Sequence, residues 1–158
     1  MKGRLKIQTR LPKINRPIDY VVVHCSETKA TDDLRACDLN DMALRRGYSG
    51  IQYHIVVGRD GKVEMGRDFS KWGIACSSPN MDYISIALCY VGGKDDEGNM
   101  ADTRTPEQKV ALRAVLTTLK SIWPNAAITG HSNHDSVECP GFDAKSEYAD
   151  ITGEVYDV

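Results

Sequence analysis

Residues 103–124, TRTPEQKVALRAVLTTLKSIWP, have the pattern of an amphipathic helix. Thr105 can cap its first turn, Pro106 occupies the first helical position, and Pro124 lies just beyond its end. Apolar residues recur at helical spacing and predict one core-facing side. That side comprises Val110, Leu112, Val115, Leu116, Leu119 and Ile122. This segment is the clearest helix of the chain.

Short apolar runs on both sides of this helix predict strands. Residues 18–26, IDYVVVHCS, and residues 84–93, ISIALCYVGG, have the length and composition of buried strands. Residues 126–131, AAITGH, predict a last short strand. Residues 52–67 predict a hairpin around the Asp60-Gly61 turn, whose glycine tolerates a positive φ.

A second helix is predicted over residues 32–48, because acids lie in its first turn and arginines near its end. Its apolar residues are Leu34, Cys37, Leu39, Met42 and Leu44. We expect residues 68–83 to form a loop and the C-terminal tail to be partly helical. Strands alternating with two helices indicate an α/β fold, in which a central mixed β-sheet is flanked by helices.

The length of 158 residues suits one compact domain with a real core. We expect residues 1–17 to form an irregular N-terminal arm with one short strand at LKIQT, and residues 18–158 to form a single domain. The composition, 41% hydrophobic and 27% charged, is ordinary for a soluble globular protein. We expect a monomer.

The net charge of −2 gives no reason to expect a nucleic-acid partner or an anionic membrane surface. No apolar run approaches the roughly 20 residues that span a bilayer. The basic N-terminus has no apolar stretch typical of a secretory signal. The chain is therefore expected to be made and folded in a reducing cytoplasm.

The five cysteines are an odd number at irregular spacing, which argues against a disulfide framework. We expect Cys25, Cys37 and Cys89 to be small buried hydrophobic residues. Cys76 lies in a polar loop, and its role stays open.

Residues 128–143, ITGHSNHDSVECPGFD, are rich in side chains that bind metals or catalyse reactions. His24 and His131 each end a predicted strand, at the sheet edge where ligand sites gather in α/β proteins. Two imidazoles and the Cys139 thiolate would make a three-ligand zinc site with an open fourth position. Spacing alone leaves two other interpretations open: a cysteine nucleophile at Cys139 activated by His131, or a polar loop with a buried thiol.

The motifs VVVHCSET, GYSGIQYHIVVGRDGKVEMGR, SIALCYVGG, DTRTPEQKVALRAVL and GH…CPGFD occur in this order. Together they resemble the N-acetylmuramoyl-L-alanine amidase family of certain phage lysozymes and the peptidoglycan recognition proteins. The resemblance covers residues 19–143. It implies a zinc hydrolase that cuts the amide between the lactyl group of N-acetylmuramic acid and the first L-alanine of the stem peptide.

The resemblance also implies the roles of particular residues. His24, His131 and Cys139 fall on the family's zinc ligands. Tyr53 falls on the tyrosine that lies beside the metal and helps to stabilise the reacting carbonyl. The expected chemistry is attack by a zinc-activated water on an amide that the metal polarises.

One family feature is missing, because Val137 occupies the position where phage members usually carry a lysine that stabilises the transition state. Losing one such donor typically costs about 10²–10³ in rate. Glu138 and His134 are candidates to compensate as acid, base or proton-transfer groups. The alternative is a peptidoglycan-binding protein of the same fold that no longer cleaves.

The resemblance further implies a phage or prophage endolysin with peptidoglycan as its partner. It would be made in the host cytoplasm and would act on the cell wall after release through a membrane lesion. That biological role follows from the family and not from any residue of the chain.

Overall fold

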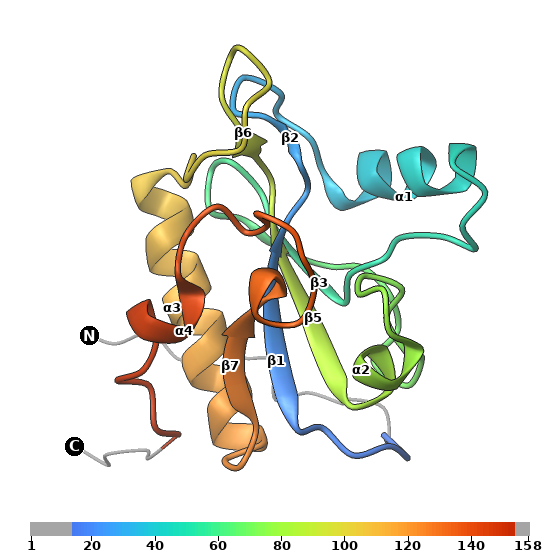
Figure 1. Ribbon diagram of the computed structural model, residues 1–158, viewed down its shortest axis with the longest axis vertical. Helices are drawn as coiled ribbons and strands as arrows, with labels where there is room; N and C mark the ends of the chain where they lie inside the picture. The colour runs from blue at the N-terminus through green and yellow to red at the C-terminus, as the bar shows by residue number, and fades with distance from the viewer. Residues whose placement is uncertain (1–13, 154–158) are drawn as a thin grey trace.

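The protein is described from a computed structural model, which covers residues 14–153 in the detail used below (Figure 1). In chain order its elements are β1 (Tyr20–Cys25), β2 (Thr28–Lys29), α1 (Ala36–Arg45), β3 (Ile55–Val57), β4 (Val63–Met65), α2 (Pro79–Tyr83), β5 (Ser85–Tyr90), β6 (Gly93–Lys94), α3 (Pro106–Ile122), β7 (Ala127–Gly130), the short 3-10 helix η1 (His131–Asn133) and α4 (Ala144–Glu147). Among these residues no helix is both long and apolar enough to cross a membrane.

A five-stranded sheet in the order β4-β3-β5-β1-β7 forms the centre of the domain. All neighbouring strands run parallel except β3 and β4, which form the predicted antiparallel hairpin. The short strands β2 and β6 pair separately. The predicted mixed sheet flanked by helices is therefore confirmed.

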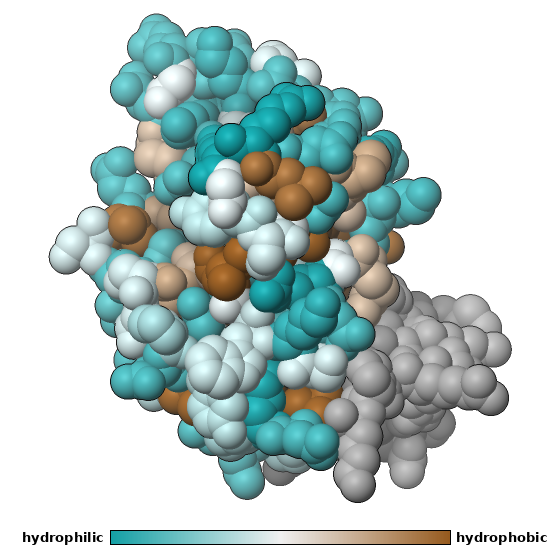
Figure 2. Space-filling model, turned by 90° about the vertical axis from the view of Figure 1, so that its right-hand side faces the viewer, coloured by the Kyte–Doolittle hydropathy of each residue, from teal (hydrophilic) through white to brown (hydrophobic). Residues whose placement is uncertain are grey.

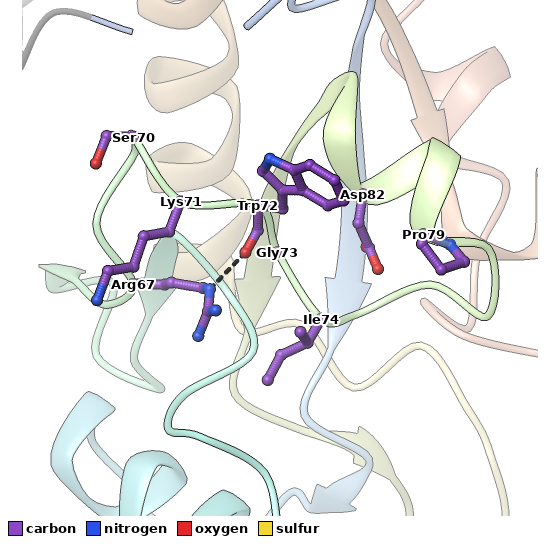
Figure 3. Close-up of a pocket in the computed structure, with 8 residues that line it drawn as sticks. All are labelled: Arg67, Ser70, Lys71, Trp72, Gly73, Ile74, Pro79 and Asp82. Carbon is purple, nitrogen blue, oxygen red and sulfur yellow. Dashed lines mark hydrogen bonds between the residues drawn. The ribbon is translucent and has the colours of Figure 1, made fainter. Parts of the chain in front are cut away.

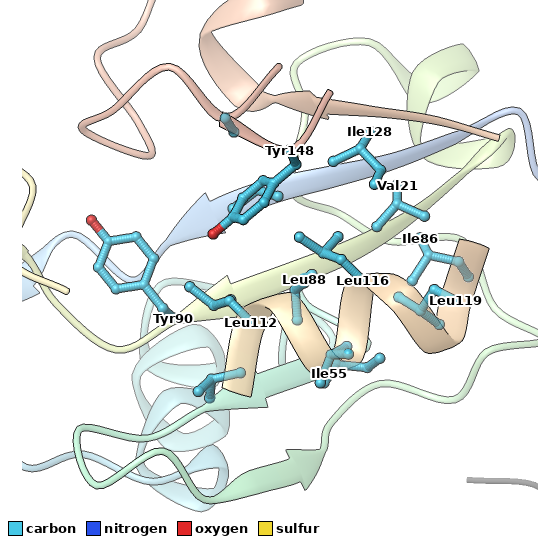
Figure 4. Close-up of a cluster of buried hydrophobic side chains, with 14 of the residues drawn as sticks. Val21, Ile55, Ile86, Leu88, Tyr90, Leu112, Leu116, Leu119, Ile128 and Tyr148 are labelled. Carbon is cyan, nitrogen blue, oxygen red and sulfur yellow. The ribbon is translucent and has the colours of Figure 1, made fainter. Parts of the chain in front are cut away.

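The larger part of the core lies between this sheet and α3 (Figure 4). Successive strand residues point to opposite faces, so alternate residues of β1, β3 and β5 meet the helix. Leu112, Leu116 and Leu119 of α3 pack against residues that include Ile86 and Leu88 of β5. The opposite face of the sheet carries a smaller cluster beneath α1, formed by Ala36, Leu39, Ile51, Val56, Cys89 and Val91.

The predicted start of α3 is confirmed in detail. The Thr105 hydroxyl accepts a hydrogen bond from the Gln108 backbone N–H, and the Gln108 side chain accepts one from the Thr105 N–H, each at 3.0 Å. The prediction for Val110 is wrong, because its side chain is 73% exposed. A rotation of 100° per residue puts Val110 on the side of the helix opposite Leu112.

Helix α1 is present but shorter than predicted, and its buried side is partly as predicted, because Leu39 is buried and Leu34 and Met42 pack against the same cluster. Ala36, Leu39 and Ala43 face the sheet. Cys37 and Leu44 are exposed, so the expectation that Cys37 is buried is wrong, whereas Cys25 and Cys89 are buried as predicted. Ala36 and Ala43 add to this buried side, and a search for large apolar residues overlooks them.

Two further segments depart from or extend the sequence prediction. The predicted loop 68–83 contains the short helix α2, which begins with Pro79 at its first position. Residues 14–17, within the predicted arm, contact the domain, because Ile14 packs on the core and Arg16 is buried. The strand predicted at LKIQT lies outside the described residues. Helix α4 confirms that the C-terminal tail is partly helical.

Candidate metal centre

His24 and His131 come together because they continue two neighbouring parallel strands. Val23 of β1 pairs with Gly130 of β7, so the residues that come next, His24 in β1 and His131 directly after β7, lie at the same sheet edge. Their ring centroids are 4.7 Å apart. The loop after η1 then brings in Cys139. Candidate ligand atoms of His24, His131 and Cys139 all lie within 4.8 Å of one another.

Cys139 is buried and held against the end of β1. Its Sγ accepts a hydrogen bond from the Cys25 backbone N–H at 3.2 Å. The contact with Cys25, and secondly burial, raise the pKa of the Cys139 thiol. A buried thiol with a raised pKa is a poor nucleophile, whereas a cation beside it would favour the thiolate. The burial of Cys139 and its place beside two imidazoles suit a metal ligand.

His24 has the state expected of a metal ligand. Burial, and secondly the neighbouring His131, hold its pKa well below the usual value, so the ring is neutral, as metal binding requires. Its Nε2 is buried and has no hydrogen-bond partner among residues 14–153. Buried polar atoms are nearly always paired, so this nitrogen calls for a partner from outside the chain. Two imidazoles and a thiolate suit zinc best among common ions.

Tyr53 lies beside this cluster, where the sequence analysis expected it. It precedes β3, and its ring centroid is 5.4 Å from that of His24. The Tyr53 hydroxyl is 3.5 Å from the Cys25 carbonyl oxygen. Burial raises the pKa of Tyr53 well above its ordinary value, so the hydroxyl stays protonated and can donate.

The other two predicted catalytic residues are placed less favourably. Glu138 is exposed and lines a hollow formed by Met100, Ser132, Asn133, Gly141, Phe142 and Asp143. His134 is tied to the sheet, because its Nε2 lies 2.7 Å from the Thr129 hydroxyl and its ring packs edge-on against Tyr20. Their roles in catalysis stay predictions.

Sequence reasoning missed Asp135, which contacts the predicted ligand His131. An Asp135 carboxylate oxygen lies 2.5 Å from Nε2 of His131. The pKa of Asp135 is lowered to about 2, and hydrogen bonds from Ser77 are the largest cause, so the carboxylate is ionised. Cys76 has a candidate ligand atom within 4.8 Å of those of His131 and Asp135. No family motif marks Asp135, and only the fold brings Ser77 to it.

A hollow of about 500 Å³ is lined by residues of the segment 67–74 and by Pro79 and Asp82 of α2, on either side of Cys76 in the chain (Figure 3). Arg67, Lys71 and Trp72 line one part of it, and Asp82 another. The side of the molecule that carries α1 and α2 is mainly polar, with hydrophobic residues in small separate groups (Figure 2). The part of this side that is drawn in colour therefore offers a mainly polar surface rather than one broad apolar face.

The fold and the donor cluster together define an α/β domain with a candidate metal centre at the carboxyl edge of its parallel strands. Residues 14–142 match the N-acetylmuramoyl-L-alanine amidase family, to which the chain therefore belongs. This result confirms the resemblance seen in the sequence. The protein is an amidase that hydrolyses peptidoglycan.

Individual relatives agree with this assignment. The endolysin of Klebsiella phage KP32 is 37% identical over 125 residues, covering 79% of this chain and 82% of the endolysin. The endolysin of Escherichia phage T7 is 33% identical over 127 residues, covering 80% and 83%. The structure of the N-acetylmuramoyl-L-alanine amidase LysC from Clostridium intestinale URNW matches with a TM-score of 0.69 at 22% identity, covering 88% of each chain. At that identity the match shows a shared fold.

Proposed function

We propose that the protein is a zinc-dependent endolysin that cuts the amide between N-acetylmuramic acid and the first L-alanine of the stem peptide. The observation that carries the proposal is the meeting of His24, His131 and Cys139 at one sheet edge, with Nε2 of His24 buried and unpartnered among the described residues. Family membership supplies the reaction class.

His24, His131 and Cys139 would hold the zinc ion. Three protein ligands leave one position free for water or substrate, as in catalytic zinc sites. When bound there, zinc supplies a water of lowered pKa and polarises the amide carbonyl. The chain's own contribution is a buried, neutral His24 and a buried Cys139 whose Sγ accepts a hydrogen bond from the Cys25 N–H.

Tyr53 would donate a hydrogen bond to the oxygen of the reacting carbonyl. Its hydroxyl is protonated, and its ring lies against His24. A donor aimed at developing negative charge stabilises the transition state more than the ground state. Its 3.5 Å contact with the Cys25 carbonyl is long for an O–H donor, so the hydroxyl can turn to a substrate at little cost.

The leaving alanine nitrogen must receive a proton, and Val137 cannot supply one. Val137 stands where phage members of the family usually carry a lysine. It is 39% exposed and adjoins Glu138, so no proton donor occupies that position. Glu138 and His134 remain the candidates for this transfer. If neither acts, a relayed water must deliver the proton.

Digestion of purified peptidoglycan with the protein separates these possibilities. Soluble products are read by mass spectrometry with no addition, with a chelator, and with zinc restored after chelation. We expect stem peptides with a free L-alanine amino terminus, lost on chelation and recovered with zinc. Release that survives chelation would indicate the cysteine nucleophile instead.

The variant Cys139→Ser is the matched control for this digestion, because serine keeps the acceptor for the Cys25 N–H and removes the thiolate ligand. It should release no peptide. Sedimentation of wild-type protein with insoluble peptidoglycan in the absence of any release would favour the non-cleaving alternative.

The endolysin role rests on the relatives. Proteins from Klebsiella phage KP32 and Escherichia phage T7 that carry that name share most of their length with this chain. We propose synthesis in the host cytoplasm, action on the wall after the membrane is opened, and a monomer as the active form. Co-expression with a membrane-permeabilising protein should lyse the host, whereas expression alone should not.

A further inference from the structure

Asp135 lies between two of the proposed ligands in sequence and contacts one of them. Its Oδ2 is 2.5 Å from His131 Nε2, four residues earlier. Both side chains are largely shielded, at 12% exposed for Asp135 and 14% for His131. A shielded carboxylate that touches one imidazole nitrogen decides which nitrogen carries the proton. Here the contact places the proton on Nε2 and leaves Nδ1 free.

Ser77 holds Asp135 from the other side. Its backbone N–H donates to Oδ2 at 2.9 Å, and its hydroxyl donates to Oδ1. Ser77 is itself fixed, because the preceding residues Ala75 and Cys76 donate their N–H groups to the largely buried Asp82 carboxylate, at 3.3 and 3.0 Å. The Asp135 carboxylate is therefore oriented by a segment 58 residues away in the chain.

We propose that Asp135 is a positioning residue that orients His131 as a metal ligand, with Ser77 holding the carboxylate. The inference rests on the proposed zinc centre. A second hydrogen bond to a ligating imidazole fixes its tautomer and its rotation and raises its basicity. Because Asp135 occupies Nε2, the free Nδ1 of His131 would face the metal.

Cys76 supplies the competing interpretation. Its candidate ligand atom lies within 4.8 Å of those of His131 and Asp135, so these three residues could instead bind a second ion. The contacts of Ser77 oppose a second ion at these residues, because Ser77 already donates hydrogen bonds to both carboxylate oxygens of Asp135. We therefore expect one zinc per chain, with Asp135 outside the first ring of ligands.

The test measures zinc affinity by competition with a chromophoric chelator, for wild-type protein and for Asp135→Asn, Ser77→Ala and Asp41→Asn. Asp41 is an exposed carboxylate on α1 and serves as the control. We expect Asp135→Asn to bind zinc about 10–100-fold more weakly, Ser77→Ala to show a smaller loss, and Asp41→Asn to match wild type. Zinc-free unfolding curves show whether each variant is folded.

Nitrogen NMR of the zinc-loaded wild-type protein adds a readout that a merely structural role would not move. The His131 ring should carry its proton on Nε2. Three results would each overturn the proposal. The first is a proton on Nδ1 of His131, and the second is a zinc affinity of Asp135→Asn within twofold of wild type. The third is a second zinc ion in the wild-type protein that both Asp135→Asn and Cys76→Ser lose. If wild-type protein binds no zinc, the proposed function fails first and this inference falls with it.

Discussion

His24 and His54 are both buried in the same domain, yet their surroundings differ in one decisive respect. Burial lowers the pKa of both, that of His54 to about 4. His54 finds protein partners on both nitrogens, because Nδ1 accepts from the Ala87 N–H at 3.0 Å and Nε2 lies 2.8 Å from the Lys71 carbonyl. Nε2 of His24 has no partner within residues 14–153.

The comparison teaches that burial and a lowered pKa do not by themselves mark a functional histidine. His54 has both properties, and its contacts join β5 to the segment around Lys71, as those of a structural residue do. The ring also stacks on Phe69, with centroids 5.5 Å apart. His24 differs from His54 because its Nε2 has no hydrogen-bond partner among the described residues. A buried unpaired nitrogen is costly unless something else binds it.

The largest expected effect is on catalysis at His24. Replacing His24 with Gln removes a ligand nitrogen while keeping a polar side chain of similar size. Amidase activity and zinc affinity should each fall by more than the roughly 100-fold that changes outside the ligand shell cause. The matched variant His54→Gln, where folded, should keep its zinc. An equal fall in zinc affinity in both variants would contradict the difference drawn here between His24 and His54.

Tyr53→Phe should have the next largest effect, on rate alone. Removing a single donor to a developing oxyanion costs about 10²–10³ in kcat. The phenyl ring keeps the packing against His24, so zinc affinity should stay within about twofold. Steady-state kinetics on a soluble muropeptide, with zinc content measured on the same samples, checks both halves. Unchanged kcat would remove Tyr53 from the mechanism.

His54→Ala should act on stability instead. It leaves a cavity, an unpaired Ala87 N–H and an unpaired Lys71 carbonyl, for a loss of about 3 kcal/mol. Urea unfolding of the zinc-free protein measures this loss. We expect the folded fraction to bind zinc as wild type does. A loss below about 1 kcal/mol would mean that His54 is not the structural residue described here.

The pH dependence of stability gives a more graded test. His54 is neutral in the native state down to about pH 4, whereas in the unfolded chain it takes up a proton below about pH 6.5. Its contribution is therefore complete above pH 6.5 and is lost as the pH falls toward 4, up to about 3 kcal/mol. The charges of Arg16 and Arg67 beside the ring also lower the pKa of His54, whereas the Asp68 carboxylate raises it.

The measurement is the unfolding free energy between pH 7 and pH 4 for wild-type protein and His54→Gln, both free of zinc. Comparing the two removes the contribution of His24, which both carry. The variant should show the shallower slope. Parallel curves would contradict the assignment of this slope to His54.

Much of the site could be predicted from the sequence, because His24 lies at the end of one recognisable strand, His131 follows another, and the motif around Cys139 is distinctive. Asp135 could not, since its partner Ser77 is 58 residues away and only the fold joins them. The same limit applies within helices. Helical spacing suggested a buried position for Val110, which is exposed, and gave no signal for Ala36 and Ala43, which are buried on α1 beside Leu39.

The most direct test of the central claim is a crystal structure of the zinc-soaked protein with anomalous scattering recorded on both sides of the zinc absorption edge. The account predicts one strong zinc peak, bonded to His24, His131 and Cys139, with Asp135 on the outer nitrogen of His131. A structure in which zinc leaves His24 unbound, or binds only at Cys76, His131 and Asp135, would contradict it.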